Sequence, residues 1–348
     1  MCTFLPMQVS EPTLPKIEDV AAAAGVSIST VSRVLNKPEV VRESLRRKVQ
    51  QAIVALGYVP NAGARAMMLK RSGTVGAIFP TVDNTIFAKA IDALQKRFAV
   101  AGLQLLLATS DYDPNIELTA GQSLLTSGVD GLVLCGCAQR PELLQLLSQR
   151  RIPAVHVMSW PSPQPGLITV GFDNARATKQ VVRYLLDLGH RRISMLAGIT
   201  RNNDRAAARV AGVRDALEEV GLELSLENMI ERRYEIAAAR EGLRTLLRVK
   251  IPPTAVICGN DVLAIGALLE AQSMGIDVPG GLSVVGFDDL DLAAHIPPGL
   301  TTVQIPMEQM WRTAAERMIQ TLQGREAPLE TQLEIALVVR GSTAPPMK

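Results

Sequence analysis

Short apolar runs alternate with stretches of helical periodicity along most of the chain after Gly73. A strand, a helix and a second strand in succession predict parallel pairing, because the helix must carry the chain back across the sheet. The pattern covers too many residues for one sheet, so we expect an α/β body of two doubly wound parallel-sheet subdomains. Strands are expected at 74–79, 103–108, 129–134, 154–157, 193–197, 255–258 and 283–286. Helices are expected at 87–101, 116–127, 141–149, 177–188, 209–220, 237–247 and 262–274.

The composition is that of a folded protein with an aliphatic core. Hydrophobic residues make up 47%, charged residues 20% and aromatic residues 3%, which excludes wholesale disorder and argues against a stacking surface for single-stranded nucleic acid. No apolar run is long enough to span a membrane, and the first residues lack the basic-then-apolar order of an export signal. We therefore expect a cytoplasmic protein. Its few cysteines, including those of Cys135-Gly136-Cys137, are interpreted as reduced core residues rather than a redox or metal pair.

Charge is distributed unevenly between the beginning of the chain and the rest. Residues 1–72 contain ten Lys and Arg against five acidic residues, whereas the remainder contains 26 basic and 29 acidic residues. A small basic head on a mildly acidic body favours a polyanionic partner for the head alone. The charge by itself would equally fit a solvated helical face.

The head reads as a helix-turn-helix. Apolar residues at helical spacing run from Ile17 to Ala24, the segment Gly25-Val26-Ser27 interrupts them, and the spacing resumes to Asn36. Ser27 is suited to cap the second helix, whose exposed N-terminal half would face the major groove. A third amphipathic helix at 43–56 ends at Gly57. The alternative is an ordinary helical hairpin.

The quoted run from Ile17, continued by Thr30-Val31-Ser32-Arg33-Val34-Leu35-Asn36 and Gly57-Tyr58-Val59-Pro60-Asn61, resembles the LacI/GalR family of bacterial transcription regulators. The likeness extends from about Leu14 along almost the whole chain. It implies a homodimer on an inverted-repeat operator in double-stranded DNA, with a hinge that becomes helical on DNA and inserts Met67 into the minor groove. The residues predicted to contact DNA are Ser27, Ile28, Ser29, Thr30, Ser32, Arg33, Asn36, Asn61, Arg65 and Met67.

Polar residues follow several of the predicted strands of the body, where ligands of doubly wound sheets bind. Asn203 and Arg205 follow the strand that ends at 197, and Asn260 and Asp288 follow two later strands. These side chains carry the donors and acceptors needed to hold hydroxyls or a carboxylate. From the residues alone, each of them is more readily a helix cap than a ligand contact.

The family resemblance shifts this balance towards a small-molecule effector pocket. Five residues match the family's effector positions, Met158 replaces an aspartate of some sugar-binding members, and Arg205 adds a positive charge that favours a sugar acid or sugar phosphate over a neutral sugar. The predicted effector residues are Phe87, Asn203, Arg205, Arg209, Tyr234, Asn260 and Asp288.

Two other classes of protein remain as alternatives. The sequence lacks G-x-G-x-x-G, the P-loop pattern, G-x-S-x-G and H-E-x-x-H, and its three histidines are scattered, so we predict no enzyme, cofactor or metal site. His190 itself reads as part of a surface turn. An exported sugar-binding protein of a transporter would share the two-lobed body, but would carry a signal peptide in place of the basic head.

The resulting domain prediction has four parts. An unstructured leader covers residues 1–14, a helix-turn-helix domain 15–60, a hinge 61–72, and an effector-binding and dimerisation domain 73–348. Its two subdomains are predicted as 73–173 with 305–322 and 174–304 with 323–344. The resemblance implies a regulator, most often a repressor, whose operator affinity is set by an effector bound between the subdomains.

Overall fold

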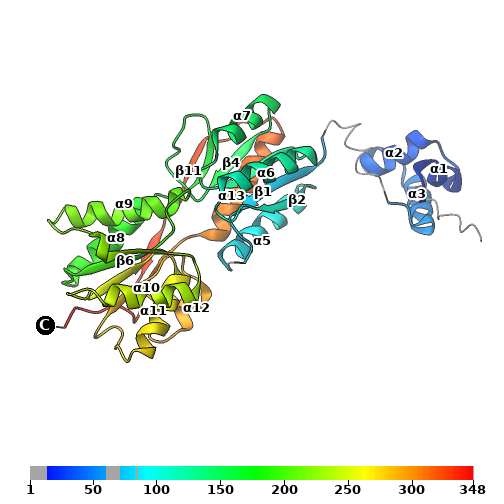
Figure 1. Cartoon of the computed structure of the whole chain (residues 1–348). Helices are drawn as coiled ribbons and strands as arrows, with labels where there is room; N and C mark the ends of the chain where they lie inside the picture. Colours follow the sequence, from blue (N-terminus) through cyan, green and yellow to red (C-terminus); the bar gives the residue numbers. More distant parts are fainter. Residues whose placement is uncertain (1–13, 60–70, 84, 348) are drawn as a thin grey trace, which may run out of the picture. The chain divides into compact units, whose positions relative to one another are not determined.

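The structure is a computed structural model that describes residues 14–59, 71–83 and 85–347, and the chain divides into two compact units, Met1–Ser72 and Gly73–Lys348. Each unit has its own hydrophobic core (Figure 1). Within the described residues, no helix is long and apolar enough to cross a membrane.

The first unit is a three-helix bundle. Its elements are α1 (Ile17–Ala24), α2 (Ile28–Asn36), a 3₁₀ turn η1 (Pro38–Val40) and α3 (Glu43–Leu56). Gly25 ends α1 in the left-handed conformation, with φ of 62°, which glycine adopts without steric cost. The Ser27 hydroxyl caps α2 by accepting the Thr30 N–H, as the sequence predicts. The core residues are Val20, Ala21, Val31, Val34, Val49 and Ala52.

The first lobe of the second unit is built on a parallel six-stranded sheet in the order β11-β5-β4-β3-β1-β2. Alternate residues of β1 point to opposite faces, so Val75 and Ala77 pack with α5 and α13 while Ile78 packs with α6 and α7. The elements are β1 (Thr74–Phe79), α5 (Thr85–Val100), β2 (Gln104–Thr109), α6 (Pro114–Thr126), β3 (Gly131–Cys135), α7 (Pro141–Arg150), β4 (Ala154–Val157), β5 (Ile168–Gly171), α13 (Met307–Leu322) and β11 (Glu330–Gln332).

The second lobe is built on a parallel four-stranded sheet in the order β7-β6-β8-β9, with a short antiparallel pair of β10 and β12 beside it. Helices α8 and α9 pack together, as do α10 and α11 (Figure 1). The elements are α8 (Asn174–Asp187), β6 (Ile193–Gly198), α9 (Asp204–Glu218), η2 (Leu226–Asn228), β7 (Met229–Arg232), α10 (Ile236–Leu247), β8 (Ala255–Cys258), α11 (Asp261–Ser273), β9 (Ser283–Val285), α12 (Asp291–His295), β10 (Thr302–Gln304) and β12 (Ala336–Val338).

The chain crosses between the lobes three times, after β5, after β10 and after β11. The third crossing corrects the predicted boundary, which places all of 323–344 in the second subdomain. Glu330–Gln332 instead pair with β5 and complete the first sheet. The strand is three residues long, and its partner strand was not predicted, so the local sequence gave no sign of the pairing.

His190 is buried, which shows that its prediction as part of a surface turn was wrong. Its ring nitrogens lie 2.9 Å from the Thr254 hydroxyl, 3.1 Å from the Ser283 hydroxyl and 2.9 Å from the Ala344 carbonyl oxygen. Burial lowers the pKa of His190. The residue therefore fastens the end of the chain to the second sheet.

Candidate functional site

The exposed face of α2 in the first unit carries the predicted base-reading side chains. Ile28, Ser29 and Arg33 are exposed, because Val31 and Val34 on the opposite face pack into the core. The two β-branched core residues thus fix which side of the helix is presented. A helix of this kind can lie in the major groove with its first two turns against base edges.

The other predicted DNA contacts differ in how far they are available. Thr30, Ser32 and Asn36 are half-buried, and the Asn36 amide donates to the Ser32 carbonyl oxygen at 2.9 Å. Ser27 is exposed, but its hydroxyl is engaged in capping. The remaining three predicted contacts lie outside the described residues: Asn61, Arg65 and Met67.

The seven predicted effector residues line one closed cavity between the lobes. Its volume is about 30 Å³, and its walls come from loops at the carboxyl ends of strands in both sheets. Ile86, Tyr112 and Met158 complete it. The seven predicted residues are Phe87, Asn203, Arg205, Arg209, Tyr234, Asn260 and Asp288.

Two of these residues serve as helix caps as well. The Asn203 side chain accepts the Ala206 N–H at the start of α9, and Asn260 accepts the Leu263 N–H at the start of α11. The cap is therefore not an alternative to the cavity position. Each amide oxygen is used by the helix, and the cap fixes the side chain at the cavity wall.

Arg209 is held rigidly by its neighbours. Its Nε donates to Asn174 Oδ1 at 2.9 Å, its Nη1 donates to the Gly259 carbonyl oxygen at 2.6 Å, and the guanidinium lies 3.7 Å from the centroid of the Phe287 ring. Asn174 in turn donates to the Met158 carbonyl oxygen. The sequence analysis did not single out Asn174. The strand before it, β5, was also not predicted, so its place at a strand end could not be recognised.

Asp288 faces Arg209 without a hydrogen bond. Its Oδ1 lies 3.8 Å from Arg209 Nη2, and neither carboxylate oxygen has a hydrogen-bond partner among the described residues. Burial raises the pKa of Asp288 to about 8, and the Arg209 charge offsets part of that rise. The backbone φ of 116° is strained for a residue with a side chain. A buried acceptor with open lone pairs can receive hydroxyl donors from a ligand.

The side of the cavity nearest Met158 is apolar and chemically inert. The Met158 sulfur accepts the Cys135 S–H at 3.6 Å. Burial raises the pKa of the Cys135 thiol to about 11 and that of Cys137 to about 12, so neither carries appreciable thiolate at neutral pH. Both are free thiols, in agreement with the prediction.

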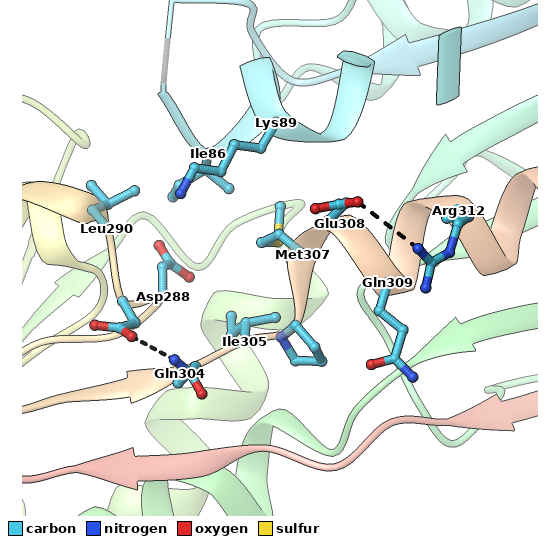
Figure 2. Close-up of a pocket in the computed structure, with 12 residues that line it drawn as sticks. Ile86, Lys89, Asp288, Leu290, Gln304, Ile305, Met307, Glu308, Gln309 and Arg312 are labelled. Carbon is cyan, nitrogen blue, oxygen red and sulfur yellow. Dashed lines mark hydrogen bonds and ion pairs between the residues drawn. The ribbon is translucent and has the colours of Figure 1, made fainter. Parts of the chain in front are cut away.

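The cavity is too small for a sugar as it stands. Ligand sites usually occupy about 300–1,000 Å³, and about 30 Å³ is the share of one water molecule in the liquid. Two larger surface pockets adjoin it. One of 560 Å³ shares Ile86 and Asp288, and lies between the first turns of α5 and α13 and the segment after β9 (Figure 2). The other, of 440 Å³, shares Tyr112, Asn203 and Tyr234. Ligand entry therefore requires the lobes to separate.

The buried Asp288 predicts a pH-dependent stability. Because its folded pKa is about 8 against an ordinary value of 3.8, the folded protein holds a proton that the unfolded chain loses. The resulting stabilisation is complete below about pH 4 and is lost as the pH rises through 8. Between pH 6.5 and 9 we expect the wild type to lose about 1–2 kcal/mol relative to Asp288→Asn.

Differential scanning calorimetry of the two proteins across that range measures the difference. Asp261, whose pKa burial raises to about 6, contributes at lower pH and is common to both proteins. Parallel curves for wild type and Asp288→Asn would show that Asp288 is already ionised in the folded protein.

Comparison with known proteins places both units in one family. Residues 16–61 match the model of bacterial regulatory proteins of the lacI family, and residues 182–343 match the periplasmic binding protein-like domain. The HTH-type transcriptional regulator GntR of Escherichia coli K12 is 32% identical over 310 residues, which cover 89% of this chain and 92% of GntR. This similarity includes a regulator's head, which the exported-protein alternative lacks.

Solved structures agree over both units. The lac repressor dimer bound to operator and an anti-inducer has a TM-score of 0.84 and 27% identity, and covers 95% of this chain and 100% of its own. The regulator CelR in complex with cellobiose has a TM-score of 0.69 and 30% identity, with coverage of 94% and 99%. The fold and the extent of the match to GntR together show that the chain belongs to the lacI family of bacterial regulatory proteins and is a transcription regulator.

Proposed function

We propose that the protein is a cytoplasmic, homodimeric repressor that binds an inverted-repeat operator and responds to a small effector held between its two lobes. The effector would be a sugar, a sugar acid or a sugar phosphate. The observation that carries the proposal is the convergence of seven separately predicted residues on one interlobe cavity. No catalytic step is assigned to the cavity, whose polar groups are arranged to bind.

The charges around the cavity favour an anionic ligand. Arg205 and Arg209 are both buried there, whereas the pKa of Asp288 is high enough for its carboxyl to be protonated at neutral pH. Arg205 is paired with Asp204 at 3.2 Å, which leaves the charge of Arg209 without a full counter-charge. A ligand carboxylate or phosphate would supply it, and the ligand's hydroxyls would face Asp288 and Tyr234.

The basic head supports operator binding by a separate route. Arg33 and the exposed Arg46 and Lys48 lie on a unit with its own core. Each phosphate that such residues neutralise lowers the slope of log affinity against log salt by about 0.9. We expect affinity to fall steeply with salt, and selectivity to rest on α2.

An apolar edge of the first sheet offers a surface for self-association. β2 is the edge strand, and Leu106 and Leu107 on it are exposed, although strands of parallel sheets are usually covered on both faces. The sequence pointed to 116–125 and the region near Ile251 instead. Ile116 and Ile251 are exposed, whereas Leu124 and Leu125 belong to the core.

The effector can control DNA binding only through its preference for one arrangement of the lobes. A ligand with equal affinity for two arrangements shifts neither, however tightly it binds. A ligand that contacts Arg209 and Phe87 at once touches both lobes, since Arg209 lies on α9 and Phe87 on α5. It therefore has the differential contacts that such control requires.

A thermal-shift screen of sugars, sugar acids and sugar phosphates tests the proposal. A ligand at one hundred times its Kd adds about 2.7 kcal/mol to the free energy of unfolding, which corresponds to a rise in Tm of roughly 5–10 °C for a large domain. The hit must also change operator affinity in a gel-shift assay. A screen in which no anionic or neutral carbohydrate raises the Tm would remove the carbohydrate part of the proposal.

A further inference from the structure

The turn after β3, Cys135-Gly136-Cys137, contacts the beginning of α9 across the space between the lobes. Asp204 Oδ2 accepts the Cys137 N–H at 3.0 Å and the Ser159 hydroxyl at 2.5 Å. Both donors belong to the first lobe, following β3 and β4, and the acceptor belongs to the second. A carboxylate that accepts two hydrogen bonds across an interface makes strong, charge-assisted contacts.

The conformation of the turn depends on its glycine. A Cβ on Gly136 would lie 1.8 Å from Arg205 Nη1 and 2.5 Å from Asp204 Oδ1, and the residue has φ of 81°. Any side chain here would displace the two α9 side chains. The close approach of the lobes at this point thus requires glycine between the cysteines, whose own thiols are buried or weakly acidic.

Other contacts close the same gap. The Tyr112 ring, after β2, lies 6.0 Å from the Tyr234 ring, after β7. Those two residues line the effector cavity, whereas Asp204 does not. Asp204 is thus an interlobe contact whose removal leaves every cavity-lining side chain in place.

We propose that Asp204, with the Cys137 N–H and the Ser159 hydroxyl, forms a latch that holds the two lobes in the closed arrangement. Separation of the lobes must break both hydrogen bonds, because donor and acceptor lie on opposite sides of the gap. The population of the open arrangement is then set by the latch, and so is the apparent affinity of any ligand that enters through it. This consequence for effector and operator rests on the function proposed above; the latch itself does not.

Hydrogen exchange of the full-length protein, read by mass spectrometry with residue resolution, tests the latch without any ligand. In Asp204→Ala we expect the Cys137 amide to exchange at least tenfold faster than in the wild type. The Gly136 amide, which donates to the Val157 carbonyl oxygen inside the first lobe, is expected to keep its rate. Asp215→Ala is the matched control, because Asp215 lies on the same helix and pairs with Lys179 at the surface.

A second pair of variants approaches the latch from the first lobe. Gly136→Ala is expected to accelerate exchange as Asp204→Ala does, and Ser159→Ala, which removes one donor, is expected to give a smaller acceleration. These substitutions keep the test decisive if Asp204→Ala lowers the Tm too far for measurement. Exchange at Cys137 that is the same in all three variants as in Asp215→Ala would overturn the latch.

Operator binding separates the latch from its regulatory use. We expect Asp204→Ala to change operator affinity at least fivefold relative to Asp215→Ala, in the direction that the effector produces. Faster exchange with unaltered operator affinity would support the latch and count against lobe-controlled DNA binding. Unchanged exchange would reject the latch whatever the operator affinity.

Discussion

Arg33→Ala is expected to abolish the preference for operator over random duplex while leaving salt-sensitive binding in place. Arg33 is exposed on α2, beside the two core valines that fix the orientation of the helix. A good base contact is worth about 1–3 kcal/mol, and a dimer makes it twice, so selectivity should fall by at least about 30-fold. Competition binding between a selected palindrome and scrambled DNA, at two salt concentrations, measures both properties.

Arg46→Ala provides the comparison for this result. Arg46 is an exposed arginine on α3, outside the predicted base-reading face. Its loss should weaken binding to both duplexes by a similar factor, as loss of a phosphate contact does. Selectivity that survives in Arg33→Ala, or that is lost equally in Arg46→Ala, would show that α2 does not read the operator through this residue.

Asp288→Ala is expected to abolish the response to the effector and to spare operator binding. Two buried carboxylate oxygens without partners are available to ligand hydroxyls, and a hydrogen bond to a charged group contributes about 1.5–3 kcal/mol. The half-maximal effector concentration should therefore rise at least about 100-fold. The measurement is a gel-shift titration of the operator complex with the carbohydrate found by thermal shift.

The exposed Asp187 in the same lobe supplies a matched substitution, Asp187→Ala, which should respond as the wild type does. The Asp288→Asn variant separates charge from shape, because it keeps the volume of the side chain. A response at the wild-type concentration in Asp288→Ala would exclude Asp288 as an effector contact. Loss of operator affinity without effector would instead assign the residue to the fold.

Much of the architecture could be predicted because it is written in local periodicity. The 3.6-residue spacing around Gly25 gave the two short helices, and the apolar runs gave β1, β4 and β8 within one or two residues of their observed bounds. Strands β5, β7, β10, β11 and β12 were not predicted. They are three or four residues long, and their pairing depends on partners far along the chain, which no local pattern encodes.

The candidate site was predictable residue by residue, but its arrangement was not. Family resemblance identified the cavity residues, whereas the closed cavity and the latch are tertiary properties. Asp204 stands between two residues that were singled out, Asn203 and Arg205, yet nothing in its neighbours indicates a partner after β3. The burial of His190 shows the same limit, since its three partners are separated from it by 64 residues or more.

The position of β11 has a consequence for how the protein is made. The first sheet begins with β1 at residue 74 and is finished only by Glu330–Gln332, after the whole second lobe has been traversed. During synthesis the helical head can fold as soon as it leaves the ribosome, since its core is local. The sensing body must wait for nearly the last codon. A prematurely terminated chain would thus carry a folded DNA-reading module with no finished sensor to govern it.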